Sequence, residues 1–126
     1  MARTIIATAA APAAPPAYSQ AVKAAGLIFV SGTAPIDPQT GSIVKGTVQE
    51  QVAQCLANIE AILVEAGSGL NRAVSATLII ADEDDFAGAN EEWIKWFEAD
   101  PPARQGAKMP VRIPGMKVSI AMIAEA

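Results

Sequence analysis

The sequence of 126 residues contains no histidine. Imidazole is the usual general base beside serine and cysteine nucleophiles, and it is the commonest metal ligand among side chains. Hydrolases that use Ser-His or Cys-His pairs are therefore excluded, together with most zinc sites. We expect a protein without a bound metal.

Cysteine is also scarce, because Cys55 is the only one in the chain. A single cysteine cannot form an internal disulfide. It recurs with Val52, Ile59 and Ile62 at the spacing of one helix face. The pattern predicts a thiol that is buried in the core rather than a reactive nucleophile.

Long hydrophobic runs and an excess of positive charge are missing as well. No segment approaches the roughly 20 consecutive apolar residues that a membrane span needs, and the start of the chain lacks the apolar region of a signal peptide. The net charge is −4, which disfavours electrostatic binding of nucleic acid. We expect a cytoplasmic protein of one domain, residues 1–126, with neither a membrane nor a nucleic acid as partner.

What the sequence does contain is apolar side chains, which make up 52% of the residues although only 5% are aromatic. The segment 26–32 is continuously apolar up to Ser31. A continuous rather than alternating run indicates a strand that is covered on both faces. So much apolar surface in a small chain suggests contacts between subunits.

Two helices are predicted. Thr47 and Glu50 have the spacing of a capping box, and apolar residues then recur with helical period as far as Ala66. The acidic run 82–85 suits the start of a second helix, which we expect to end near Phe97.

Runs rich in β-branched residues predict the strands, with a turn at 37–41 that makes a hairpin. The expected strands are 3–8, 26–32, 42–44, 74–80 and 117–124. This order fits an α/β (α+β) fold in which two helices pack on one face of a mostly antiparallel or mixed sheet. Two helices leave the other face uncovered, so we expect self-association through the sheets.

Arg104 follows two consecutive prolines, which end the preceding acidic helix and start a new element. Its planar guanidinium can present two donors to a carboxylate or phosphate. The alternative is a surface arginine that pairs with the acids of residues 82–100.

Two further side chains have open alternatives. Asn90 shares the apolar face of its helix with Phe86 and Trp93, so its amide needs a partner in a neighbouring loop or in a ligand. Tyr18, the only tyrosine, either lies across an edge of the core or lines a pocket.

Four motifs in register resemble the Rid family of YjgF-like reactive-intermediate (enamine/imine) deaminases. They are Pro16–Ala21, Phe29–Gly32, Asp85-Phe86 with Asn90-Glu91, and Pro102–Arg104. The resemblance implies a chorismate-mutase-like fold and a homotrimer with inward-facing sheets and ligand clefts between subunits. It also implies hydrolysis of 2-imino or 2-enamino acids to 2-keto acids and ammonia, with no cofactor.

The resemblance also implies roles for individual residues. Arg104 matches the arginine that holds the substrate carboxylate, while Tyr18, Ser31 and Asn90 match residues of the cleft. Gly106 stands at a substrate-binding position where typical deaminating members have a cysteine. Ser119 stands where they have a glutamate that orients the attacking water, which makes Ser119 the second catalytic candidate beside Arg104.

These departures leave two functions open. One is a deaminase for small imino acids, with Arg104 as the carboxylate anchor. The other is a trimeric module of the same fold that binds small carboxylates without turnover, because the hydroxyl of Ser119 is a poor base at neutral pH. A ribonuclease or translation inhibitor, a function of some relatives, is disfavoured by the absent histidine and the negative net charge.

Overall fold

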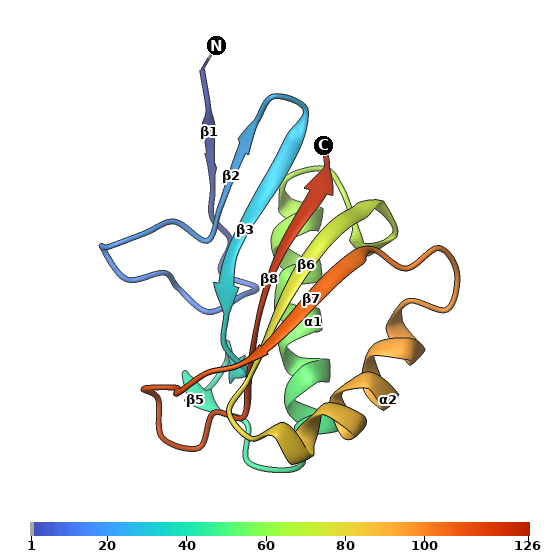
Figure 1. Ribbon diagram of the computed structural model, residues 1–126. Coiled ribbons are helices and arrows are strands. Elements are labelled where there is room, and N and C mark those ends of the chain that lie inside the picture. The colour runs from blue at the N-terminus through green and yellow to red at the C-terminus, as the bar shows by residue number, and fades with distance from the viewer. Residues whose placement is uncertain (1) are drawn as a thin grey trace.

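The computed structural model describes residues 2–126, which form a main sheet with two helices against it (Figure 1). The strands and helices follow in the order β1 (Thr4–Ile6), β2 (Ala21–Ala24), β3 (Leu27–Thr33), β4 (Ile36–Asp37), β5 (Ser42–Ile43), α1 (Val48–Glu65), β6 (Ala73–Ile80), α2 (Phe86–Trp96), β7 (Ala103–Lys108) and β8 (Val118–Glu125). Two short 3-10 helices, Leu70–Arg72 and Glu83–Asp85, precede β6 and α2.

The main sheet has the strand order β1-β2-β3-β8-β6-β7, and β4 pairs with β5 in a separate hairpin. All neighbours in the main sheet are antiparallel except β6 and β7, which run parallel with Ala76 opposite Arg104. The sheet is therefore mixed, as predicted. Strand β7 lies at its edge, and all six of its residues are exposed.

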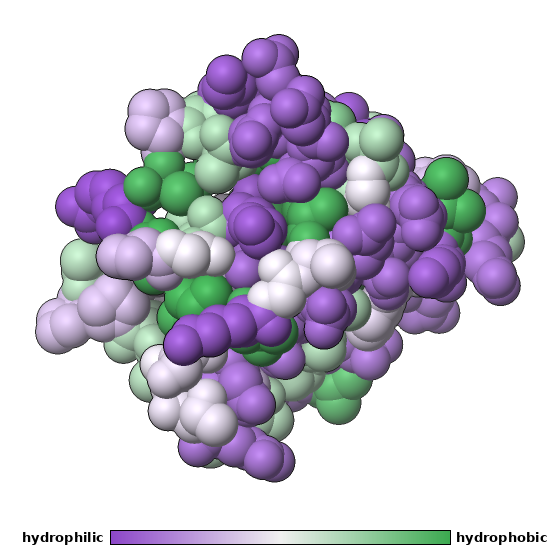
Figure 2. All heavy atoms as spheres, turned by 90° about the horizontal axis from the view of Figure 1, so that it is seen from below, coloured by the Kyte–Doolittle hydropathy of each residue, from purple (hydrophilic) through white to green (hydrophobic). Residues whose placement is uncertain are grey.

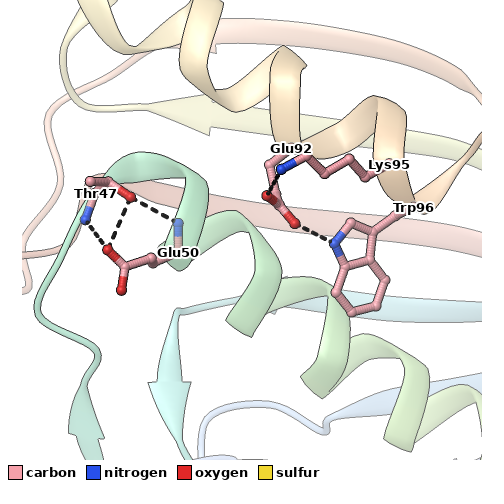
Figure 3. Close-up of polar contacts among 5 residues, drawn as sticks. All are labelled: Thr47, Glu50, Glu92, Lys95 and Trp96. Carbon is pink, nitrogen blue, oxygen red and sulfur yellow. Dashed lines mark hydrogen bonds and ion pairs between the residues drawn. The ribbon is translucent and has the colours of Figure 1, made fainter.

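Helix α1 begins as the sequence predicts. The Thr47 hydroxyl accepts a hydrogen bond from the Glu50 amide at 3.2 Å, and the Glu50 carboxylate accepts one from the Thr47 amide at 3.1 Å (Figure 3). The apolar face of the helix lies on the sheet, where Leu56, Ile59 and Leu63 are fully buried. Burial of each such side chain stabilises the fold by about 1.5–3 kcal/mol.

Helix α2 begins later than predicted, because the acidic run forms a 3-10 turn first. The Asp82 carboxylate accepts a hydrogen bond from the Asp84 amide at 2.9 Å and so caps that turn, not the α-helix. Within α2, Glu92 accepts a hydrogen bond from the Trp96 indole at 2.9 Å and pairs with Lys95 at 3.5 Å (Figure 3).

The apolar periods do not predict β2 and β7. Strand β2 is rich in alanine, which has a low β propensity, and it forms through a tight hairpin to β3. Both central residues of that turn, Ala25 and Gly26, have positive φ, the conformation that suits two-residue hairpins. The first strand is shorter than expected, because the Thr8 amide donates its hydrogen bond to the Gln20 side chain and not to a neighbouring strand.

The face of the sheet without helices carries an apolar row, which we define as Ile5, Val22, Phe29 and Ile123. These residues are register partners across β1, β2, β3 and β8. Ile5 is 51% exposed and Phe29 is 42% exposed. Within one chain, the helices thus cover only one of the two faces.

No helix in residues 2–126 is long and apolar enough to cross a membrane.

Candidate functional site

Arg104 lies at the start of β7, where two side chains of α2 hold its guanidinium. Its Nη2 donates a hydrogen bond to Asn90 Oδ1 at 2.6 Å, and its Cζ lies 5.2 Å from the centre of the Trp93 ring. We call Arg104, Asn90 and Trp93 the arginine cluster. Its guanidinium lies on the helix face of the sheet, because Arg104 is the register partner of buried Ala76.

The cluster bears on the alternatives that the sequence leaves open for Arg104 and Asn90. The ion pairs within residues 2–126 join Lys95 to Glu92 and Lys108 to Glu83, so Arg104 does not pair with an acid there. The partner of Asn90 is neither a loop nor a ligand but Arg104 itself, and Asn90 is half-buried. The amide orients the guanidinium without neutralising it, which leaves its full charge for an anion.

Gly106 lies two residues after Arg104 and therefore on the same face of β7. A Cβ atom at this position would lie 2.8 Å from Cε1 of Phe86 and 3.3 Å from its Cζ. The first distance is shorter than carbon atoms tolerate without a shift. The ring of Phe86 thus fills the space that a cysteine side chain would occupy, which gives a physical reason for glycine here.

Tyr18 and Ser31 line a different feature, a cavity of about 520 Å³ that we call the loop cavity. Its walls are formed by residues 12–20, the end of β3, Ile36 of β4, Ile62 of α1 and the loop before β8. Tyr18 is 54% exposed, so it lines a pocket rather than an edge of the core. In Figure 2 the surface is hollowed, with apolar atoms inside, on the side where the segment between β1 and β2 lies in Figure 1.

One buried amide explains how the proline-rich segment presents Tyr18. The Gln20 side chain donates hydrogen bonds to the carbonyls of Thr8 at 3.1 Å and Pro12 at 2.7 Å, and it accepts one from the Thr8 amide at 2.7 Å. Sequence reasoning missed this residue. Its signal is an amide side chain four residues after a tract whose prolines cannot supply backbone donors.

Ser31 is also held by a backbone group, since its hydroxyl donates to the Ser19 carbonyl at 2.6 Å. Gly32 follows it in the cavity wall, and a Cβ on Gly32 would lie 3.5 Å from Ser119 Oγ. Ser119 belongs to the helix-free face, because its neighbours Val118 and Ile120 are fully buried on the other face. Ser119 therefore lies beside the loop cavity, because its strand β8 is the neighbour of β3 in the sheet.

One chain does not bring all the expected site residues together. Strands β3 and β7 are separated by β8 and β6, which places them roughly 14 Å apart at the usual strand spacing. Arg104 and Ser119 also project from opposite faces of the sheet. Arg104, Asn90 and Gly106 thus form one group, and Tyr18, Ser31 and Ser119 form another.

Cys55 is confirmed as a core residue. It is fully buried, and its Sγ lies 3.3 Å from the Thr33 carbonyl as a donor. Burial raises the pKa of the thiol far above its usual range, so a thiolate does not form at neutral pH. Within residues 2–126 no group of three or more histidine, cysteine, aspartate or glutamate side chains is placed to hold a metal ion.

Comparison of the sequence with known proteins finds relatives over most of the chain. The family model described as "Endoribonuclease L-PSP" matches residues 8–126. A RutC family protein from Pyrococcus abyssi is 47% identical over 104 residues, 82% of each chain. A 2-iminobutanoate/2-iminopropanoate deaminase from Capra hircus is 40% identical over 122 residues, which cover 97% of this chain and 89% of that one.

Solved structures agree with the sequence relatives. A protein of unknown function from Yersinia pestis, of the conserved Rid family, superposes with a TM-score of 0.95 at 32% identity, over 99% of this chain and 100% of that one. The E. coli protein TdcF, solved with bound serine, has a TM-score of 0.91 at 35% identity over 98% of each chain. The chain therefore belongs to the YjgF/Rid family, the family of the endoribonuclease L-PSP model.

Proposed function

We propose that the protein is a deaminase that hydrolyses small 2-imino acids to 2-keto acids and ammonia. The proposal rests on the contacts of Arg104. Its guanidinium is oriented by Asn90 and Trp93 but is not neutralised by an acid. The relative from Capra hircus supports it by its name, and the serine bound to TdcF is a small amino acid with a carboxylate.

The reaction needs little from the protein beyond positioning. Water adds to the carbon of the C=N bond, whose electron pair moves to nitrogen. Proton transfers then let the nitrogen leave as ammonia while the C=O bond forms. Because an imine is already electrophilic, holding its carboxylate on Arg104 beside an ordered water supplies much of the catalysis. Ser31 and Ser119 carry hydroxyls that suit water binding.

The proposed site lies between subunits of a homotrimer. Arg104 and the loop cavity are separated within one chain, so the arginine of one copy would face the cavity of the next. The apolar row on the helix-free face supports the same arrangement, because exposed apolar surface of this kind commonly marks an interface. Sedimentation equilibrium should show three times the chain mass, and a stable monomer at micromolar concentration would remove the shared site.

A carboxylate-binding module without turnover is the second candidate, and Ser119 is the observation that favours it. Neither Ser119 nor the residues that line the loop cavity provide a carboxylate base. A serine hydroxyl can bind a water but does not deprotonate it at neutral pH. In this case Arg104 would still hold the carboxylate, and only the hydrolytic step would be missing.

Coupling to a threonine dehydratase distinguishes the two candidates. That enzyme releases 2-iminobutyrate, whose absorbance decays slowly without a deaminase. We expect the wild type to accelerate the decay, Arg104→Ala to lose the effect, and the exposed control Arg3→Ala to retain it. No acceleration by the wild type, together with Arg104-dependent binding of 2-oxobutyrate, would favour the binding module. Acceleration that survives in Arg104→Ala would reject the assigned role of Arg104.

A further inference from the structure

The loop cavity contains a cation that the proposed reaction does not use. Arg112, from the loop between β7 and β8, lines the cavity together with Tyr18 and Ser31. Among the described residues that form the wall it is the only charged one, and the rest of the lining is mainly alanine, proline and isoleucine. A lone positive charge beside apolar walls attracts an anion more strongly than the same charge in open water, because the local dielectric constant is lower.

Arg112 also lacks an internal partner. Its side chain is exposed, and within residues 2–126 it makes neither a hydrogen bond nor an ion pair. Some other cations are engaged: Arg72 donates to the Ala126 carbonyl at 2.8 Å, and Lys23 donates to the Ala66 carbonyl at 2.9 Å. The guanidinium of Arg112 is therefore free to bind a ligand in the cavity.

The loop that carries Arg112 is anchored rather than loose. Pro110 and Pro114 restrict its backbone on both sides. After it, buried Gln51 donates to the Gly115 carbonyl at 2.9 Å and accepts from the Lys117 amide at 2.7 Å. These bonds tie the loop to α1, so Arg112 is presented at a defined place along the cavity wall.

We propose that Arg112 is a second anion-binding residue, and that the protein prefers 2-imino acids that carry a second, distal carboxylate. The inference rests on the proposed function, in which Arg104 of a neighbouring copy holds the first carboxylate. The cavity of about 520 Å³ is within the size range of small-molecule sites. Uncharged Ser119 beside the cavity suits such a substrate, because an acid there would repel its second carboxylate.

Calorimetry with two keto acids tests the inference. The probes are 2-oxobutyrate, with one carboxylate, and 2-oxoglutarate, with two. In the wild type we expect 2-oxoglutarate to bind about tenfold more tightly, the size of one modest charge-assisted contact. Arg112→Gln should lose this preference while its affinity for 2-oxobutyrate stays the same. The control Arg3→Gln removes an equal charge outside the cavity and should behave as the wild type.

The outcomes separate this inference from the proposed function. Equal affinities of the wild type for both acids, or an Arg112→Gln variant that keeps the preference, would overturn it. A similar loss for both acids in Arg112→Gln would also overturn it, since that result indicates a general effect of charge. If the wild type prefers 2-oxoglutarate through Arg112 but hydrolyses no imine, the second anion site stands and the deaminase proposal fails.

Discussion

The arginine cluster and the loop cavity are built in different ways. The cluster stands on regular elements, α2 and β7, and each of its contacts joins one side chain to another. The cavity is formed mostly by loops, and three of its polar side chains, those of Gln20, Ser31 and Thr33, donate to backbone carbonyls. The charge of Arg104 is thus positioned by secondary structure, whereas the shape of the cavity depends on a stiff, proline-rich segment.

Within one chain, neither region contains all the residues of the proposed site. The arginine cluster supplies a charge that does not line the loop cavity, and the cavity has walls and hydroxyls but no Arg104. Closed symmetry offers a solution, because each copy in a ring can present one region to its neighbour and receive the other. The following experiments test this division, beginning with the largest expected effect.

Mixing two inactive variants tests whether the regions come from different chains. Arg104→Ala keeps an intact cavity, and the double variant Tyr18→Ala/Ser31→Ala keeps an intact arginine cluster. After denaturation and joint refolding in equal amounts, about a quarter of the clefts should combine two intact halves. Activity should return to about that fraction of the wild-type value. A mixture that stays inactive would place both regions in one chain.

Replacing the guanidinium by an ammonium tests the geometry of the cluster. Arg104→Lys keeps the charge but loses the planar fork, the bond to Asn90 and the stacking on Trp93. We expect its affinity for 2-oxobutyrate in calorimetry to fall about a hundredfold, nearly as far as for Arg104→Ala. Arg3→Lys serves as the matched control. Wild-type affinity in Arg104→Lys would mean that charge alone holds the ligand.

Adding a carboxylate beside the cavity tests what Ser119 lacks. A positioned base contributes at least about a hundredfold to many reactions, so Ser119→Glu should raise turnover of 2-iminobutyrate to a similar degree. The new charge repels the substrate carboxylate, so the affinity must be measured separately. Ser42→Glu, at an exposed position of β5, adds the same charge elsewhere. If the wild type is already fast and Ser119→Glu brings no gain, Ser119 does not replace a missing base.

A stability measurement tests the contact between Gly106 and Phe86. Gly106→Cys forces a Cβ against the ring and should lower the free energy of unfolding by about 1–3 kcal/mol in urea denaturation. Placing Gly106→Cys in a Phe86→Ala background should reduce that loss, because the two positions are in contact. Unchanged stability of Gly106→Cys would show that the ring moves aside at little cost.

Local patterns predicted much of the fold. The capping box at Thr47, the helical spacing around Cys55 and the turn at 37–41 are confirmed, because each depends on residues that are close in the chain. The strands at 26–32, 74–80 and 117–124 are confirmed to within two residues. Strand β7 was not predicted, since its exposed residues carry no apolar period and it forms only by pairing with β6.

The sequence by itself determined the two helices, the buried thiol and the set of candidate residues, because periodicity and residue chemistry are readable along the chain. Only the tertiary structure decided how those residues are grouped. Strand order places Arg104 far from Tyr18 and Ser31, and the alternation of side chains puts Arg104 and Ser119 on opposite faces. Strand order and register depend on packing between distant segments, which local patterns do not specify.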